Sequence, residues 1–195
     1  MSGSSHHLNK LKNCGIVSGY LIGSKVVVFD VEKARCLFSH GFYGKPVGVR
    51  KPKEVDIDLP LELSLIEALF LCREEVLKVY SGSREISVEE LQDLVSRVFS
   101  NFEELYLVYE DVKSQGFTIR SALKYGADFA IYRTRPGLEH APYLVKVVSK
   151  NQLLDPGDMV GWGRISHSVR KTLLIAVPDR REKEVSYVVL KWFKP

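Results

Sequence analysis

Apolar and polar positions alternate along the second half of the chain in a way that predicts a hairpin. The alternation runs through Ala127 to Tyr132 and again through Tyr143 to Val148, which is the pattern of two half-buried strands. The polar loop between them, RTRPGLE, ends at a single histidine, His140. Further strands are predicted, from β-branched and aromatic residues between glycines, over 16–29, 37–49, 103–109, 117–120, 173–177 and 185–193.

Helical periodicity separates these strands and makes the order mixed. After Pro60, apolar residues recur three or four apart as far as Val76, which predicts an amphipathic helix begun by Ser64 or the proline. Ser87 and Glu90 form a capping box before a second apolar stripe over 88–98. Shorter helices are predicted over 111–115, ended by Gly116, and over 166–171. These elements predict a mixed α/β (α+β) fold.

Composition limits the class of protein without deciding the function. The chain has 195 residues, of which 45% are apolar and 27% charged, enough for one substantial domain or two small ones. We divide it into an amino-terminal domain over 1–97 and a second domain over 98–195. The opening MSGSSHH is typical of a tag remnant and is left out of the fold prediction. No apolar run approaches the ~20 residues of a spanning helix, so a soluble, cytoplasmic protein without membrane contact is expected.

Cysteine and charge add two expectations. Cys14, Cys36 and Cys72 are odd in number and never spaced C-x-x-C, so reduced, buried thiols are predicted rather than disulfides or a zinc site. The net charge is only +4, but lysine and arginine gather in the last third of the sequence. That bias favours a polyanionic partner, although a solvated charged face gives the same count.

Three polar side chains stand where strands or helices end: Tyr132, His140 and Lys171. Each has a simpler explanation, as a packing tyrosine, a surface histidine and a solvated lysine. Together they match the cleavage of RNA by its own 2′-hydroxyl, which needs a base, an acid and a cation for the phosphorane, and no metal. A tyrosine titrates near ~10 and is a poor base unless neighbouring cations lower its pKa, which Lys171 and the nearby arginines could do.

Three separated motifs carry a resemblance to a known family. The runs RSALKYGADFAIY, EHAPYLVKVV and GRISHSVRKTLLIAV resemble, in order, the catalytic domain of the archaeal tRNA-splicing endonucleases. In the first half, YGKP and LSLIEALFL resemble that family's amino-terminal domain, so the resemblance covers nearly the whole chain. It implies a small amino-terminal mixed α/β domain followed by a restriction-endonuclease-like α/β catalytic domain.

The resemblance also implies an activity and roles. It implies a cofactor-free enzyme that cuts introns from precursor tRNA at a bulge-helix-bulge structure, leaving a 2′,3′-cyclic phosphate and a 5′-hydroxyl. Tyr132 would be the general base, His140 the general acid and Lys171 the transition-state stabiliser. Arg164, just before the expected last helix, would stack on a bulge base, with a surface phosphate contact as the open alternative. His167 is interpreted as structural.

The segment PDRREKE departs from the family pattern. Homotetrameric members carry an acidic loop there, which inserts into a basic pocket of a partner. Here acidic and basic residues offset one another, which makes a poor electrostatic plug. We therefore favour the catalytic subunit of a heterotetramer with a separate structural subunit over a homotetramer, with the alternating final strand YVVLKWF able to pair with another subunit.

Two other functions remain open from the sequence. One is a non-catalytic structural or RNA-binding subunit of the same complex, against which the joint presence of Tyr132, His140 and Lys171 argues. The other is a metal-dependent nuclease of restriction-enzyme-like fold, which would need clustered carboxylates that the sequence does not show in the usual arrangement.

Overall fold

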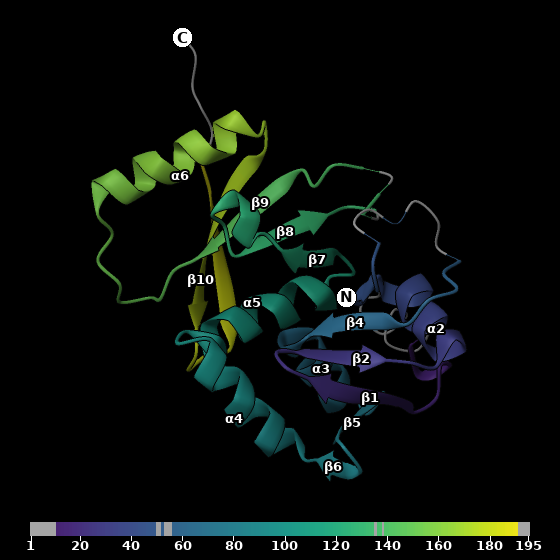
Figure 1. Ribbon diagram of the computed structural model, residues 1–195. Helices are drawn as coiled ribbons and strands as arrows, with labels where there is room; N and C mark the ends of the chain where they lie inside the picture. Colours follow the sequence, from purple (N-terminus) through teal and green to yellow (C-terminus); the bar gives the residue numbers. More distant parts are fainter. Residues whose placement is uncertain (1–10, 50–51, 53–55, 135, 138, 191–195) are drawn as a thin grey trace. The chain divides into compact units, whose positions relative to one another are not determined.

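The computed structural model describes residues 11–49, 52, 56–134, 136–137 and 139–190. It forms a first compact unit that ends at Phe102 and a second that begins at Glu103. Each unit contains one mixed β-sheet with helices packed beside it (Figure 1). The opening MSGSSHH and the last residues of the predicted final strand lie outside the described residues. Among the described residues, no helix combines the length and the apolar character needed to cross a membrane.

The sheet of the first unit has the strand order β3-β4-β2-β1-β5-β6. Its strands are β1 (Val17–Ile22), β2 (Lys25–Val28), β3 (Lys45–Pro46), β4 (Leu61–Ser64), β5 (Leu77–Ser81) and β6 (Arg84–Ile86). The β1 and β5 strands pair in parallel, and the other neighbours are antiparallel. The predicted strands over 16–29 are confirmed as β1 and β2, whereas β5 and β6 were not predicted.

Three helices accompany this sheet: α2 (Val31–Gly41), α3 (Leu65–Arg73) and α4 (Val88–Val98). The predicted capping box of α4 is confirmed, since Ser87 Oγ accepts from Glu90 N at 3.2 Å. Ser64 likewise caps α3, which confirms the first of the two predicted starts. The alternative start at Pro60 is wrong, because Leu61–Ser64 alternates with period two and forms a strand. The prediction of strands over 37–49 is wrong at its start, where Ala34, Leu37, Phe38 and Gly41 form the buried stripe of α2.

The prediction of reduced cysteines is wrong for two of the three residues. Cys14 and Cys36 form a disulfide, and Cys72 is the free thiol. The two partners are far apart in sequence and meet only because α2 packs beside the segment before β1. Spacing along the chain therefore gave no indication of the pair. Burial raises the pKa of Cys72 to about 12, helped by Glu85, so this thiol is unreactive near neutrality.

The sheet of the second unit has the order β11-β10-β9-β8-β7. It contains β7 (Thr118–Ser121), β8 (Phe129–Tyr132), β9 (Tyr143–Val147), β10 (Thr172–Asp179) and β11 (Glu184–Leu190). β9 and β10 pair in parallel and all other neighbours are antiparallel. The hairpin predicted from the alternation is confirmed as β8 and β9.

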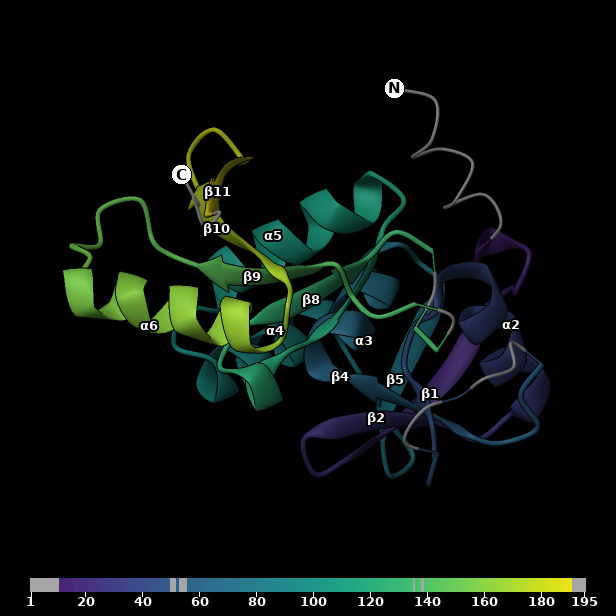
Figure 2. The same cartoon turned by 90° about the horizontal axis from the view of Figure 1, so that it is seen from above.

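Two helices lie on opposite sides of this sheet, α5 (Phe102–Ser114) and α6 (Pro156–Ser168) (Figures 1 and 2). The strand predicted over 103–109 is wrong, because Leu105, Tyr106, Val108 and Tyr109 are buried with helical spacing along α5. Short apolar runs such as LYLVY do not separate strand from helix by periodicity alone. The helix predicted over 166–171 is also corrected, since α6 starts ten residues earlier, with Asp155 accepting from Gly157 N at 2.6 Å.

Candidate active site at one end of the second sheet

Strand pairing brings three chain segments to the same end of the second sheet. Ile131 pairs with Tyr143, and Tyr143 pairs with Thr172, so β8 ends where β9 and β10 begin. Tyr132 is the last residue of β8 and Lys171 immediately precedes β10. His140 lies in the loop that leads into β9. The hairpin and the parallel crossover thus place all three predicted residues at this end.

Tyr132 and Lys171 also lie on one side of the sheet, since Lys171 Nζ is 5.9 Å from the ring centroid of Tyr125, which packs on the same cluster as Tyr132. Ala130 pairs with Leu144, which pairs in turn with Leu173, and side chains two apart along a strand point to the same face. Tyr132 packs against this cluster of buried residues, as do Tyr125 and, from α6, Trp162 and Ile165. The face that carries Tyr132 is therefore the one covered by α6.

The end of α6 explains where Lys171 stands. Lys171 N donates to Ser166 O at 2.9 Å, and Arg170 N donates to His167 O at 3.1 Å. Arg170 has a left-handed φ of 53°, so these two hydrogen bonds complete a Schellman motif. This turn stops the helix and directs the chain into β10 at Thr172, whose N–H donates to Pro142 O at 3.0 Å.

The ammonium of Lys171 is held beside the histidine segment. Its Nζ donates to the carbonyl oxygen of Ala141 at 2.5 Å, and it lies 5.9 Å from the centroid of the Tyr125 ring. Ala141 is buried, and it directly follows His140. An ammonium has three N–H donors, and this contact uses one of them. The main chain next to His140 therefore fixes the position of the lysine charge.

The environment of Tyr132 combines burial with nearby positive charges. Burial raises the pKa of Tyr132, while Arg120 and Lys124 act in the opposite direction and Tyr125 and Glu139 add to the rise. The neighbouring cations therefore act in the direction that the proposed base requires, but in the chain by itself desolvation of the phenolate outweighs the two positive charges and the pKa is raised.

The loop that precedes His140 is braced by its own polar groups. Glu139 Oε1 accepts from Thr134 N at 2.6 Å, and Arg133 Nη2 donates to the hydroxyl of Tyr143 at 2.5 Å. The Arg133 guanidinium also lies 5.4 Å from the centroid of the Tyr143 ring. His140 itself is exposed. These contacts connect both ends of the loop and present the imidazole to solvent.

Arg164 and His167 both lie on α6 and both are exposed. Because α6 begins at Pro156, Arg164 is inside the helix and not before it, which corrects the expected boundary. The base-stacking role of Arg164 and the structural role of His167 stay predictions.

Sequence reasoning missed the turn that precedes β8, the single-turn helix η1 (Leu123–Tyr125). Its Tyr125 ring faces two ammonium groups, with Lys124 Nζ 4.7 Å and Lys171 Nζ 5.9 Å from its centroid. Gly126 ends the turn at a φ of 72°, and a Cβ there would lie 3.1 Å from Ile165 Cδ1. The sequence KYG before a strand was the available indication, since a glycine is needed for both the backbone angle and the close approach.

Comparison with known proteins decides the family. The family described as "tRNA intron endonuclease, catalytic C-terminal domain" matches residues 102–187, and "tRNA intron endonuclease, N-terminal domain" matches residues 17–92. A tRNA-splicing endonuclease of Saccharolobus islandicus is 45% identical over 92% of this chain and 100% of its own length. The chain belongs to the tRNA-splicing endonuclease family.

Two further relatives agree. The tRNA-splicing endonuclease of Hyperthermus butylicus is 46% identical over 92% of this chain and all of its own length, and that of Sulfolobus acidocaldarius is 43% identical over 92% and 99%. The resemblance inferred from the three motifs is confirmed by these matches, as is the mixed α/β fold of the family's two domains.

In this member of the tRNA-splicing endonuclease family, the side chains close enough to bind a metal ion belong to the first unit, whereas the candidate site belongs to the second, among the residues that the structure describes. Within the part of the chain that the structure describes, Cys14, Cys36 and His40 of the first unit form the one group of three or more histidine, cysteine or carboxylate side chains close enough to hold an ion. A metal-dependent nuclease needs clustered carboxylates to bind its ion. Among the described residues at the end of the second sheet, no such cluster of three or more ligands is found.

Proposed function

We propose that this chain is the catalytic subunit of an endoribonuclease that excises introns from precursor tRNA at bulge-helix-bulge structures without a metal ion. Its family membership supports the substrate class. The observation that carries the chemistry is the Lys171 ammonium bonded to Ala141 O, next to His140 and on the sheet face that Tyr132 shares. The catalytic domain is proposed as 98–195 and the amino-terminal domain as 1–97.

In the proposed reaction, Tyr132 removes the proton of the 2′-hydroxyl, whose oxygen attacks the neighbouring phosphorus. The bond from phosphorus to the 5′-oxygen breaks, and His140 protonates that leaving oxygen. The products are a 2′,3′-cyclic phosphate and a 5′-hydroxyl. Each proton-transfer group is typically worth ~100- to 10,000-fold in rate.

Lys171 supplies the positive charge that the phosphorane needs. Because Nζ is already fixed by Ala141 O, the ammonium requires little reorganisation when charge develops on the phosphoryl oxygens. The raised pKa of Tyr132 keeps its hydroxyl protonated near neutrality in the free chain. Proton transfer in the proposed mechanism is therefore concerted with attack, so that no free phenolate has to accumulate.

Arg164 is proposed to bind the RNA by stacking on an unpaired base of the bulge. Its exposed position on α6 leaves the guanidinium plane accessible from solvent. An arginine plane covers a splayed base with cation–π contact worth about 0.5–2 kcal/mol.

The proposed partner is a separate structural subunit in a heterotetramer, with a homotetramer as the alternative. Within the loop between β10 and β11, Asp179 Oδ1 accepts from Arg181 N at 2.9 Å. The contact of Asp179 with Lys150 Nζ lowers the pKa of this carboxyl group. One of the loop's few acids is thus already engaged within the chain, which weakens the loop as an acidic plug for a partner's basic pocket.

Cleavage of a bulge-helix-bulge RNA by the purified chain, alone and with a candidate structural subunit, tests the proposal. We expect cutting to persist in excess chelator and to yield cyclic phosphate ends. His140→Ala should bind the RNA but cut it at least ~100-fold more slowly in a single turnover. Loss of cutting in chelator would support the metal-dependent nuclease instead, and binding without cutting under all conditions would support the non-catalytic subunit.

A further inference from the structure

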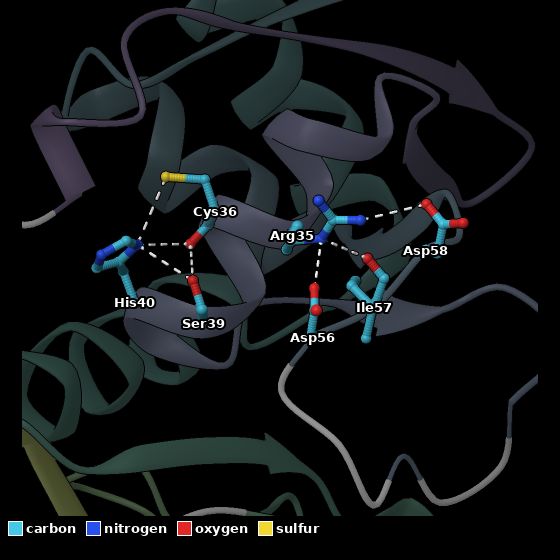
Figure 3. A network of polar contacts seen from close by, with 7 residues as sticks. All are labelled: Arg35, Cys36, Ser39, His40, Asp56, Ile57 and Asp58. Atoms are coloured by element: carbon cyan, nitrogen blue, oxygen red, sulfur yellow. Dashed lines mark hydrogen bonds and ion pairs between the residues drawn. The ribbon is translucent and has the colours of Figure 1, made fainter.

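The disulfide of the first unit lies against a histidine that the proposed function does not use. Cys36 and His40 are one helical turn apart on α2, and Cys36 Sγ lies 3.5 Å from His40 Nδ1 (Figure 3). The ligand atoms of Cys14, Cys36 and His40 all lie within 4.8 Å of one another. Cys14 is buried, while Cys36 and His40 are half-buried, so this cluster is reachable from one side.

The spacing of these atoms fits a soft metal ion. Zinc is bound by thiolate sulfur at ~2.3 Å and by imidazole nitrogen at ~2.0–2.1 Å in tetrahedral sites. A sulfur and a nitrogen on one tetrahedral ion are then about 3.5–3.6 Å apart. The 3.5 Å between Cys36 Sγ and His40 Nδ1 already has this value. Only the two sulfurs have to separate to about 3.8 Å, the tetrahedral spacing at that bond length.

Other contacts hold the cluster together when the disulfide is open. Lys33 Nζ donates to the carbonyl oxygen of Cys14 at 2.5 Å, which ties the segment before β1 to α2 independently of the sulfurs. His40 Nδ1 is 3.0 Å from the carbonyl oxygen of Cys36. That carbonyl also accepts from Ser39 Oγ at 3.1 Å, so it keeps a donor when the imidazole turns to an ion.

On the far side of the same helix, α2 is fixed by different groups. Arg35 Nε donates to Ile57 O at 2.9 Å and pairs with Asp56 at 2.6 Å, and its Nη2 lies 3.2 Å from Asp58 (Figure 3). These contacts hold the helix against the segment that precedes β4. Opening the disulfide therefore leaves α2 in place.

We propose that Cys14, Cys36 and His40 form a redox-gated site for a zinc-like ion, occupied when the cysteines are reduced and closed when they form the disulfide. A dithiol reductant supplies two electrons and two protons to the disulfide and is itself oxidised to a disulfide. The ion then displaces the two thiol protons and binds two thiolates and one imidazole, with water in the fourth position. This inference is independent of the proposed nuclease activity.

Cobalt(II) titration of the full chain under anaerobic conditions tests the proposal, before and after reduction with a dithiol that is then removed. The reduced protein should bind one cobalt ion with thiolate-to-cobalt charge-transfer absorption, and zinc should displace it. The oxidised protein should show no such absorption. Absence of the absorption in reduced protein that keeps its native circular dichroism would overturn the proposal and leave a structural disulfide only.

Variants assign the ligands. Cys36→Ser should abolish the charge-transfer absorption, and His40→Asn should weaken cobalt binding by about 10- to 100-fold or more, the size found even for groups that only support a ligand. The matched control is Cys72→Ser, because this half-buried thiol is the free cysteine of the described chain. Equal absorption in wild type and His40→Asn, or its loss in Cys72→Ser, would each contradict the assigned ligand set.

A thermal measurement needs no variant. Zinc that binds the folded, reduced chain raises its stability by about 2.7 kcal/mol at a free concentration of 100 Kd. The melting temperature of the reduced chain should therefore rise with zinc, and that of the oxidised chain should not change. An equal rise in both forms would place the ion elsewhere and refute the redox gate.

Discussion

Replacing Lys171 by methionine separates the two tasks that the structure gives this side chain. Methionine keeps an unbranched, flexible stem but has no hydrogen-bond donor. In the wild-type chain, Ala141 O accepts a hydrogen bond from the Lys171 ammonium at 2.5 Å. Removing one partner of a hydrogen bond to a charged group costs about 1.5–3 kcal/mol. At about 2–4 °C per kcal/mol for a chain of this length, the melting temperature should fall by several degrees.

The catalytic loss should be larger than this loss of stability suggests. Removing one fixed donor to a developing oxyanion typically lowers the chemical rate by about 100- to 1000-fold, which is about 2.7–4 kcal/mol. Single-turnover cleavage of a bulge-helix-bulge RNA, at enzyme concentrations above the dissociation constant, measures the chemical step alone. RNA binding, measured by filter retention or anisotropy, should change little, because one phosphate contact among many carries a small part of the affinity.

Lys146→Met is the matched control for this experiment. Lys146 is also a half-buried lysine of the second sheet, and its Nζ bonds to Asp128 Oδ1 at 3.1 Å. It should lose a comparable amount of stability without a comparable loss of cleavage. A Lys171→Met enzyme that cuts at the wild-type single-turnover rate, or a Lys146→Met enzyme that is equally slow, would refute the role assigned to the Lys171 ammonium.

Four further predictions follow from the same contacts. Burial raises the pKa of Tyr132. The fall in single-turnover rate at alkaline pH should therefore lie above pH ~10, the ordinary tyrosine value. A fall well below that pH would contradict Tyr132 as the base. Tyr125→Phe keeps the ring that faces Lys171 at 5.9 Å and should cut normally, whereas Tyr125→Leu should cut about two- to fivefold more slowly, the worth of an exposed cation–π contact. Arg170 has a φ of 53°, so Arg170→Gly should melt within a few degrees of wild type while Arg170→Val melts clearly lower, because β-branched residues are strained there. The Tyr187 hydroxyl donates to Asp111 Oδ2 at 2.6 Å, and burial raises its pKa. Tyr187→Phe should lower the free energy of unfolding by about 1–3 kcal/mol at neutral pH. Because a raised pKa stabilises the fold fully only below the pKa of the unfolded chain, near ~10, this difference should shrink as the pH rises above that value.

The sequence predicted those parts of the second unit that local patterns determine. The hairpin over β8 and β9 follows from strict alternation, and Gly116 ends α5 because its φ of 84° suits glycine. The start of α6 was missed because Gly157, Gly161 and Gly163 weaken its helical pattern. Its boundary depends instead on the Asp155 cap.

Contacts between distant segments were beyond the reach of sequence patterns. The disulfide between Cys14 and Cys36 depends on how α2 packs, and the sequence shows only an uninformative spacing. The net direction of the pKa of Tyr132 depends on the balance of burial against Arg120 and Lys124. The sequence showed cations but not the burial, so it did not decide the net direction.

The arrangement at the end of the second sheet makes the positions of Tyr132 and Lys171 independent of the loop that joins β8 to β9. Tyr132 is positioned by its pairing with Thr118 in β7, and Lys171 by the turn that ends α6 and by the carbonyl of Ala141. Neither position depends on the path of the loop between the two hairpin strands. Because Ala141 follows His140 and leads into β9, whereas Lys171 leads into β10, a shift of β9 against β10 would break the bond from Lys171 to Ala141 O and separate the imidazole from the ammonium. The register of three strands, and not the length of this loop, therefore determines whether the three proposed catalytic groups can meet one phosphate.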